Sequence, residues 1–297
     1  MRARVGVIGA VAALALGATA VAQEPVPPAP APPVGNFGGG RVVLPNGDPF
    51  GRGNAVIGMR STASGKIQVE ATVRGKCGGG TFPAEDDINV DGTFQLKGVN
   101  TRRPESGVRV KTTYDIRGTL TETGVEDGVA SATSEIRVKG QETLTCKSGN
   151  VPFKVRRLTG DIGTPGPKPN TRYYGNTSEK RHSVRRGIVL RVSDGGTRLR
   201  RALYGVTLKC NRRKLPDTID TPRRNVAISA QGNLKDNVKS TFREARTLTR
   251  SSERFSGQLG STGAKGTLSI SERTFSRRTK KLLETCRTGR IRWTAAP

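Results

Sequence analysis

The residues that could do chemistry in this chain are few: four cysteines, one histidine and one short run of acidic and amide side chains. The cysteines fall into two pairs of nearly equal spacing, Cys77 with Cys146 and Cys210 with Cys286. Cysteines of exported proteins form disulfides, whereas cysteines of cytosolic proteins more often bind metal or act in catalysis. The chemistry open to these thiols therefore depends on the compartment.

The N-terminus predicts export. Arg2 and Arg4 precede an apolar run over residues 5–18, and Ala20-Val-Ala22 provides small residues for signal-peptidase cleavage before Gln23. We therefore expect residues 1–22 to be a signal peptide. The apolar run is shorter than the roughly 20 residues that a membrane-spanning helix needs, so no membrane span is expected. The predicted location is secreted or extracytoplasmic, with association to the cell wall left open.

The cysteine pairs belong to a larger internal similarity. Residues 146–153, Cys-Lys-Ser-Gly-Asn-Val-Pro-Phe, match residues 286–293, Cys-Arg-Thr-Gly-Arg-Ile-Arg-Trp, in the positions of the cysteine, glycine and terminal aromatic residue. Residues 116–124 also align without a gap with residues 255–263. A similarity at this separation predicts one domain that occurs twice.

This duplication selects one of the three connectivities that four cysteines allow. Each cysteine ends or follows an alternating apolar stretch at an equivalent position, and duplicated folds bring equivalent partners together. We therefore predict the disulfides Cys77–Cys146 and Cys210–Cys286. Each would close a loop of about 70 residues and contribute roughly 4 kcal/mol in the chain-entropy model.

The elements that must position these residues are strands. Ile67, Val69, Ala71 and Val73 alternate with polar residues, and Asp-Gly and Asn-Gly turns separate such runs. The predicted fold class is all-β, with two tandem antiparallel β-sandwich or barrel-like domains. The predicted organisation after the signal peptide is a Pro-rich linker at 23–35, a first β domain at 36–160, a linker at 161–171, and a strongly basic second β domain at 172–297.

The second half resembles a β domain of many secreted bacterial proteins from GC-rich genomes. The motifs that carry this resemblance are Tyr174-Gly-Asn-Thr-Ser178, Val206-Thr-Leu-Lys-Cys210, Gly266-Thr-Leu-Ser-Ile270 and the segment 286–293. The first half has Phe153 in place of the tryptophan and lacks the opening motif. The resemblance implies an extracytoplasmic β domain and transfers no activity.

The sequence gives little support for a catalytic site or a metal site. His182 is the one histidine; it has basic neighbours and no evident carboxylate to orient it, which favours a solvated loop residue. With the cysteines paired, no thiolate nucleophile or zinc ligand set remains. Phe153 and Trp293 lie in the apolar register and are predicted core residues. We expect no catalytic residue, metal site or cofactor, although a serine-lysine arrangement has no sequence signature that would reveal it.

The segment Asp87-Ile-Asn-Val-Asp-Gly92 resembles the start of a calcium loop, with oxygen-bearing side chains at alternate positions. The twelfth position of such a loop would be Gly98, which provides no bidentate carboxylate. A strand that runs into an Asp-Gly turn and out through residues 93–96 is therefore the favoured interpretation.

Charge is distributed very unevenly. The chain has a formal net charge of +27. Residues 24–166 carry 18 Lys and Arg against 15 Asp and Glu, whereas residues 167–297 carry 31 against 9. Adjacent cations cluster at predicted loops and strand ends, where they could contact phosphates of wall polymers, anionic lipids or nucleic acid. The predicted anion-binding patch comprises Arg212, Arg213, Lys214, Arg223, Arg224, Arg277, Arg278, Lys280 and Lys281.

The expected function is that of an exported, non-enzymatic binding or structural protein of the cell surface, whose second domain contacts an anionic polymer. A neutral explanation of the charge is the arginine-rich composition of GC-rich genomes. The alternative functions are a carbohydrate- or protein-binding module that uses loop sites, or an extracytoplasmic hydrolase with an unfamiliar site. Aromatic residues make up 4% of the chain, and no row of rings suited to stacking on sugars is visible.

Overall fold

The computed structural model describes residues 31–43, 52–103, 107–158, 160–211 and 214–297; for residues 78–79 and 214–225 it describes the backbone alone. The predicted signal peptide and residues 23–30 of the predicted Pro-rich linker lie outside these ranges. All regular elements of the described part are β-strands, in two antiparallel sheets. The predicted all-β class with two barrel-like parts is confirmed.

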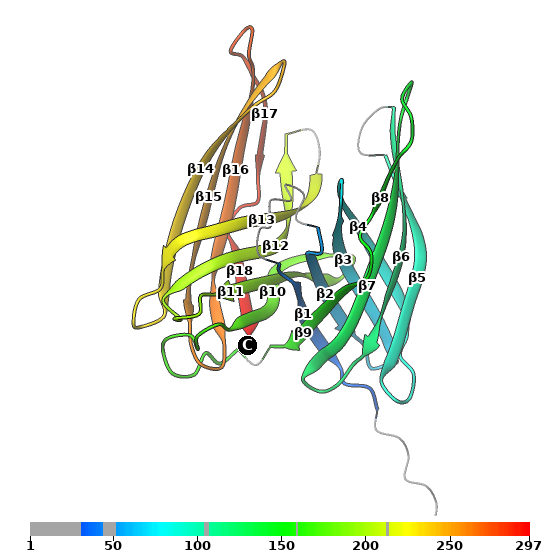
Figure 1. The fold of residues 1–297 in the computed structure, drawn as a ribbon, viewed down its shortest axis with the longest axis vertical. Coiled ribbons are helices and arrows are strands. Elements are labelled where there is room, and N and C mark those ends of the chain that lie inside the picture. The colour runs from blue at the N-terminus through cyan, green and yellow to red at the C-terminus, as the bar shows by residue number, and fades with distance from the viewer. Residues whose placement is uncertain (1–30, 44–51, 104–106, 159, 212–213) are drawn as a thin grey trace, which may run out of the picture. The chain divides into compact units, whose positions relative to one another are not determined.

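The first sheet contains nine strands. They are β1 (Gly35–Arg41), β2 (Ala55–Ser61), β3 (Lys66–Gly75), β4 (Gly78–Asp87), β5 (Thr93–Arg102), β6 (Val108–Thr119), β7 (Gly124–Val138), β8 (Leu144–Lys147) and β9 (Val151–Arg157). Their order is β4-β3-β2-β1-β9-β7-β6-β5, with β8 paired to β7. The sheet curls until β4 and β5 approach each other, which forms a nearly closed barrel (Figure 1).

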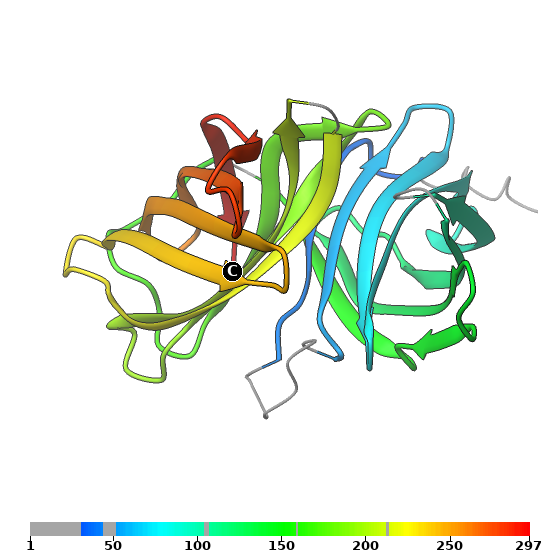
Figure 2. The same ribbon diagram turned by 90° about the horizontal axis from the view of Figure 1, so that it is seen from above.

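The second sheet also contains nine strands. They are β10 (Arg172–Arg181), β11 (Val184–Val192), β12 (Arg198–Cys210), β13 (Lys214–Ala227), β14 (Asn233–Arg243), β15 (Thr247–Leu259), β16 (Ala264–Ser276), β17 (Leu282–Arg287) and β18 (Ile291–Ala296). Their order, β13-β12-β11-β10-β18-β16-β15-β14, repeats that of the first sheet with every number raised by nine. Here β17 pairs with both β12 and β16, which closes the barrel (Figure 2).

The residue two positions after the second cysteine makes the same hydrogen bonds in both barrels. Ser148 accepts a hydrogen bond from Ala132 N–H at 2.9 Å and donates one to the Gly149 carbonyl at 2.6 Å. Thr288 makes the equivalent bonds with Ile270 N–H at 3.0 Å and the Gly289 carbonyl at 2.8 Å. The two disulfides, Cys77–Cys146 and Cys210–Cys286, are formed as predicted.

Each barrel has its own apolar interior, which the alternating strands supply. The first includes Ile57, Phe82 and Phe153, and the second includes Phe255 and Trp293, all at most 2% exposed. The rings of Phe255 and Trp293 are stacked with centroids 5.2 Å apart. The prediction that both aromatic residues of the cysteine motifs are core residues is therefore confirmed.

The two barrels pack against each other within one compact unit of residues 31–297. A third buried cluster, separate from both interiors, joins them and comprises Val42, Val56, Tyr174, Val189 and Leu203. Gly58 of β2 lies so close to β11 that a Cβ there would overlap the Arg185 carbonyl oxygen. Glycine thus permits the backbones of the two sheets to approach closely.

The segment between the barrels is bound to the second one. Thr164 N–H and its hydroxyl both donate to the Ser261 hydroxyl, at 3.1 and 2.8 Å. Gly166 N–H donates to the Leu259 carbonyl, and Pro165 bridges to Gly260. The predicted linker at 161–171 therefore lies along the turn between β15 and β16.

Candidate functional site

The predicted anion-binding patch is only partly visible. Arg212 and Arg213 lie outside the described residues, and Lys214, Arg223 and Arg224 lie in β13, where the backbone alone is described. The remaining four are exposed at the turn between β16 and β17; they are Arg277, Arg278, Lys280 and Lys281. The Arg277 guanidinium donates to the carbonyls of Glu244 and Ala245, which fixes this turn against the turn between β14 and β15.

A larger group of cations lies on the outer surface of the same four strands. Phe255, Leu268 and Ile270 are buried and point into the barrel, so the residues between them point outward. Eight exposed cations occupy such outward positions in β14–β17, two of which, Arg243 and Lys265, lie near the strand ends, and the other six lie nearer the middle of the array. These six residues, here called the basic face, are Lys235, Lys239, Arg250, Arg254, Arg273 and Arg287.

Strand register places the members of the basic face beside one another. One row across the four strands comprises Thr241, Arg250, Arg273 and Thr285. The next row comprises Lys239, Ser252, Ser271 and Arg287. Neighbouring strands lie about 4.8 Å apart and rows on one face about 7 Å apart, so the cations form a two-dimensional array rather than a line. Figure 1 shows these strands side by side along one flank of the second barrel.

Short hydroxyl side chains separate the long cations and leave hollows between them. One open hollow of about 770 Å³ is lined by Lys239, Arg250, Arg254, Arg273 and Arg287, together with serines and threonines of the same strands. A second, of about 600 Å³, shares Arg254 and Ser269 with it and extends to Lys235. Guanidinium, ammonium and hydroxyl donors therefore line two adjoining hollows, the second of which also includes Asp236 in its lining.

No carboxylate occupies an outward position in β14–β17. The acidic residues of these strands have the opposite alternation; they are Asp236, Glu253, Glu272 and Glu284. Glu253 is buried and accepts a hydrogen bond from Tyr204. Among the described residues, none pairs with a cation of the basic face within 4.0 Å. The positive charge of this face is uncompensated.

The equivalent face of the first barrel shows the opposite arrangement. Lys97 and Arg117 lie 3.9 and 3.8 Å from Asp115, and Arg137 lies 3.7 Å from Glu135. Carboxylates thus neutralise cations on β5–β7. The same fold carries a mixed, paired surface in one barrel and an array of unpaired cations in the other, so the array is a property of the second sequence and not of the fold.

The remaining candidates from the sequence are turn residues. His182 is exposed in the two-residue turn between β10 and β11, where His182 and Ser183 have φ of 48° and 67°. The Asp-Gly turn is present as predicted: Asp91 accepts hydrogen bonds from Thr93 N–H and its hydroxyl at 2.9 and 2.7 Å, which lowers the pKa of Asp91. Gly92 has a φ of 83°.

The second barrel contains a copy of this turn, which the sequence analysis did not identify. Gly232 N–H donates to the Ser229 carbonyl as Gly92 N–H does to Asn89, at 2.8 and 2.9 Å. The copy lies at 229–233, and Gln231 stands in place of the aspartate. In the described part of the chain, Cys210, Glu284 and Cys286 form the one cluster with metal-ligand geometry, but both cysteines are in a disulfide.

Comparisons of this chain with protein-family models, curated proteins and solved structures find no match. The resemblance of the second half to a secreted β domain remains a prediction. Within the described residues, no helix has the length and apolar character needed to cross a membrane.

Proposed function

We propose that the protein binds an anionic polymer through the basic face of the second barrel. The main support for this proposal is the segregation of charge. The six exposed cations of the basic face share one sheet surface from which carboxylates are absent. Unpaired cations on a rigid surface attract polyanions and release their counterions on binding, which drives association at low salt.

An extended polymer fits this surface better than a compact ligand. Arg250 and Arg254 are four residues apart on β15, which corresponds to about 13 Å along the strand. Lys235 and Lys239 repeat this spacing on the neighbouring strand. Only a ligand with several charges in sequence can contact such a series at once, and the serine and threonine hydroxyls between the cations can donate to the same ligand.

The cellular setting of this proposal is the predicted export. An exported protein that carries such a face would meet wall polymers, anionic lipids or extracellular nucleic acid, all of which present phosphate. We propose a non-enzymatic role at the cell surface, in which the basic face of the second barrel makes the contact with the polymer. Sugar binding through stacked rings is less favoured because Phe242 is the one aromatic residue among the strongly exposed large apolar side chains of the described chain.

Two charge-matched variants test the proposal with polyphosphate as the probe. The first removes four cations of the basic face through Lys239→Gln, Arg250→Gln, Arg254→Gln and Arg273→Gln. The second removes four cations from the equivalent face of the first barrel through Lys97→Gln, Arg109→Gln, Lys111→Gln and Arg137→Gln. Both lower the net charge of +27 by the same amount, so they differ only in where the charge lies.

We expect the first variant to bind polyphosphate at least tenfold more weakly than the parent chain at low salt. The second variant should remain within about threefold of the parent, because Lys97 and Arg137 are already paired with carboxylates and Glu135 lies opposite Lys111 on the same face. Equal losses in the two variants would mean that net charge alone attracts the polymer, and the basic face would then not be a site.

A further inference from the structure

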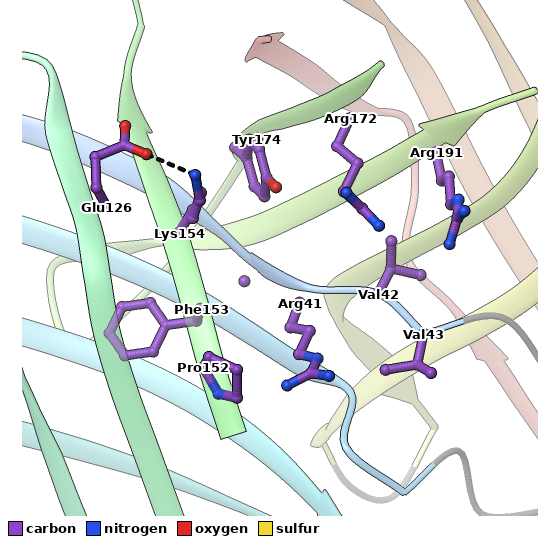
Figure 3. A pocket seen from close by; sticks show the side chains of 11 residues that line it. Arg41, Val42, Val43, Glu126, Pro152, Phe153, Lys154, Arg172, Tyr174 and Arg191 are labelled. Carbon is purple, nitrogen blue, oxygen red and sulfur yellow. Dashed lines mark ion pairs between the residues drawn. The ribbon is translucent and has the colours of Figure 1, made fainter. Parts of the chain in front are cut away.

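A second group of arginines lies outside the basic face, where the two barrels meet. Arg41 at the end of β1, Arg172 at the start of β10 and Arg191 in β11 line a cavity of about 300 Å³. Figure 3 shows the three arginine side chains on one side of this cavity and Lys154 with Glu126 on the other. Residues from both barrels are needed to form it.

The arginines are placed against one another by the strand register. Arg172 lies directly opposite Arg191 in the ladder between β10 and β11, and Arg191 lies opposite Arg201 in the ladder between β11 and β12. Like charges that face each other across a ladder destabilise a sheet. Burial, together with the charges of Arg172 and Arg200, lowers the pKa of Arg191, and Asp194 only partly opposes this.

The described surroundings do not neutralise this charge. Glu126 is the one carboxylate that lines the cavity, and it is already engaged by Lys154 at 2.8 Å and by Arg156. Arg201 donates to the Val43 carbonyl. No described residue forms an ion pair with Arg41, Arg172 or Arg191 within 4.0 Å. Three guanidinium groups therefore line one cavity, and none of them is ion-paired to a carboxylate of the described residues.

We propose that this cavity, here called the arginine cleft, binds a compact ligand that carries a phosphate monoester. Phosphate offers two negative charges and several acceptor oxygens, which match the planar forks of more than one guanidinium at once. Val42, which is 3% exposed, and the Tyr174 ring, which is 8% exposed, add an apolar wall for a short organic group.

The arginine cleft differs in size from the proposed polymer site. A volume of about 300 Å³ lies at the lower end of the range for small-molecule sites, so the cleft admits a sugar phosphate or a terminal phosphate group. The basic face is open and extends over four strands, whereas the arginine cleft is a single cavity between the barrels. The two sites therefore differ in ligand class and share no residue.

Thermal unfolding of the full exported chain with inorganic phosphate tests the arginine cleft. Ionic strength is held constant with sodium chloride, and acetate provides a monovalent control. We expect phosphate to raise the melting temperature in a saturable manner, because a ligand that binds only the folded state stabilises it, and we expect acetate to have little effect.

The double variant Arg172→Gln/Arg191→Gln should lose the phosphate-dependent rise, and calorimetric titration should show at least tenfold weaker phosphate binding. Without phosphate, its melting temperature should equal or exceed that of the parent, because the like-charge contact is relieved. The melting temperature measured without phosphate thus shows that the double variant is folded. A phosphate-dependent rise that persists in the double variant, or one that acetate reproduces in the parent, would overturn the proposal.

The basic-face variant provides the matched control. It lacks four cations elsewhere, so it should keep the full response to phosphate while it loses polyphosphate binding. The arginine-cleft variant should show the reverse pattern. A basic-face variant that lost the phosphate response would show that the two groups of cations form one site and would contradict a separate arginine cleft.

Discussion

Arg181 of β10 donates a hydrogen bond to the Glu70 carboxylate of β3 at 2.6 Å, and so joins the two barrels by an ion pair. The Glu70 side chain is 2% exposed and that of Arg181 is 28% exposed. A carboxylate in such a position depends on its partner, because a buried charge without one is strongly destabilising. The ion pair lies beside a two-residue turn that places the Arg181 side chain toward the first barrel.

Substitution of Arg181 tests this dependence. Arg181→Met should lower the free energy of unfolding by about 3 kcal/mol, since it leaves the Glu70 charge without its cation. Lys180→Met changes an exposed neighbour in the same strand and should alter stability by less than about 0.5 kcal/mol. Urea denaturation measures both. Equal effects of the two substitutions would show that the ion pair contributes nothing specific.

Substitutions in the turn between β10 and β11 should increase the stability of the protein. His182 and Ser183 both have positive φ, which two-residue hairpin turns require and which Asn-Gly adopts with least strain. The change His182→Asn/Ser183→Gly should therefore raise the free energy of unfolding by about 1 kcal/mol. A shift of the urea midpoint to higher concentration checks this result. A decrease would mean that the two side chains make stabilising contacts that outweigh backbone strain.

Glu179 predicts a specific dependence of stability on pH. Its burial raises the pKa of the carboxyl, although the Thr207 N–H at 2.7 Å and the charges of Arg186 and Lys209 oppose the shift. A raised folded-state pKa means that the contribution to stability is complete below the ordinary pKa of 4.5 and is lost as pH rises through the folded-state value. Glu179→Gln should thus be more stable than the parent at neutral pH.

The difference between Glu179→Gln and the parent should disappear below pH 4.5, where both side chains are neutral. Denaturation curves across this interval provide the measurement. A variant that is less stable than the parent at neutral pH would show that the attraction of Arg186 and Lys209 exceeds the cost of burial, which is the opposite sign.

Loss of the second disulfide should lower the stability of the whole compact unit. Cys210 and Cys286 are paired residues of β12 and β17, and they enclose a sequence separation of 76 residues. Replacement of both by serine should lower stability by about 4 kcal/mol in the chain-entropy model. Because the barrels share a buried cluster, calorimetry should show one transition that moves as a whole. Two transitions, of which only one moves, would show that the barrels unfold independently.

Several features could be predicted because they depend on local pattern. The alternation of Ile67, Val69, Ala71 and Val73 predicts a strand with one buried face, and all four are buried. The disulfides followed from equivalent positions in two similar halves. The Asp91-Gly92 turn followed from the conformational preference of its residues.

The basic face could not be found in the same way, because its cations are not adjacent in sequence. Arg250 and Arg254 are separated by serines and by Glu253, so sequence inspection finds a mixed segment. Only the strand register shows that Glu253 points inward and that Arg273 from the next strand joins the same surface. The sequence signal that could have revealed it is the period of two in the charges of residues 233–287.

The contact between the barrels could not be predicted from the sequence, for a related reason. A glycine within a strand is expected to weaken it, and this applies to Gly58 and Gly187. In the folded protein, however, these glycines leave room for the backbone of the opposite sheet to approach. The arginine cleft depends on that contact, because Arg41 and Arg172 belong to different barrels. No pattern within either half encodes it.

The salt dependence of polyanion binding decides whether the basic face is the polymer site. Duplex DNA is a suitable probe because its charge density is known, and the logarithm of the binding constant falls linearly with the logarithm of salt concentration. If the basic face contacts phosphates, replacement of Lys239, Arg250, Arg254 and Arg273 by glutamine should reduce the steepness of this line by about 3.6, which is about 0.9 per lost contact. The charge-matched variant of the first barrel should keep the slope of the parent. Parallel lines for the parent and the basic-face variant would contradict the account, because the ion pairs would then be formed elsewhere.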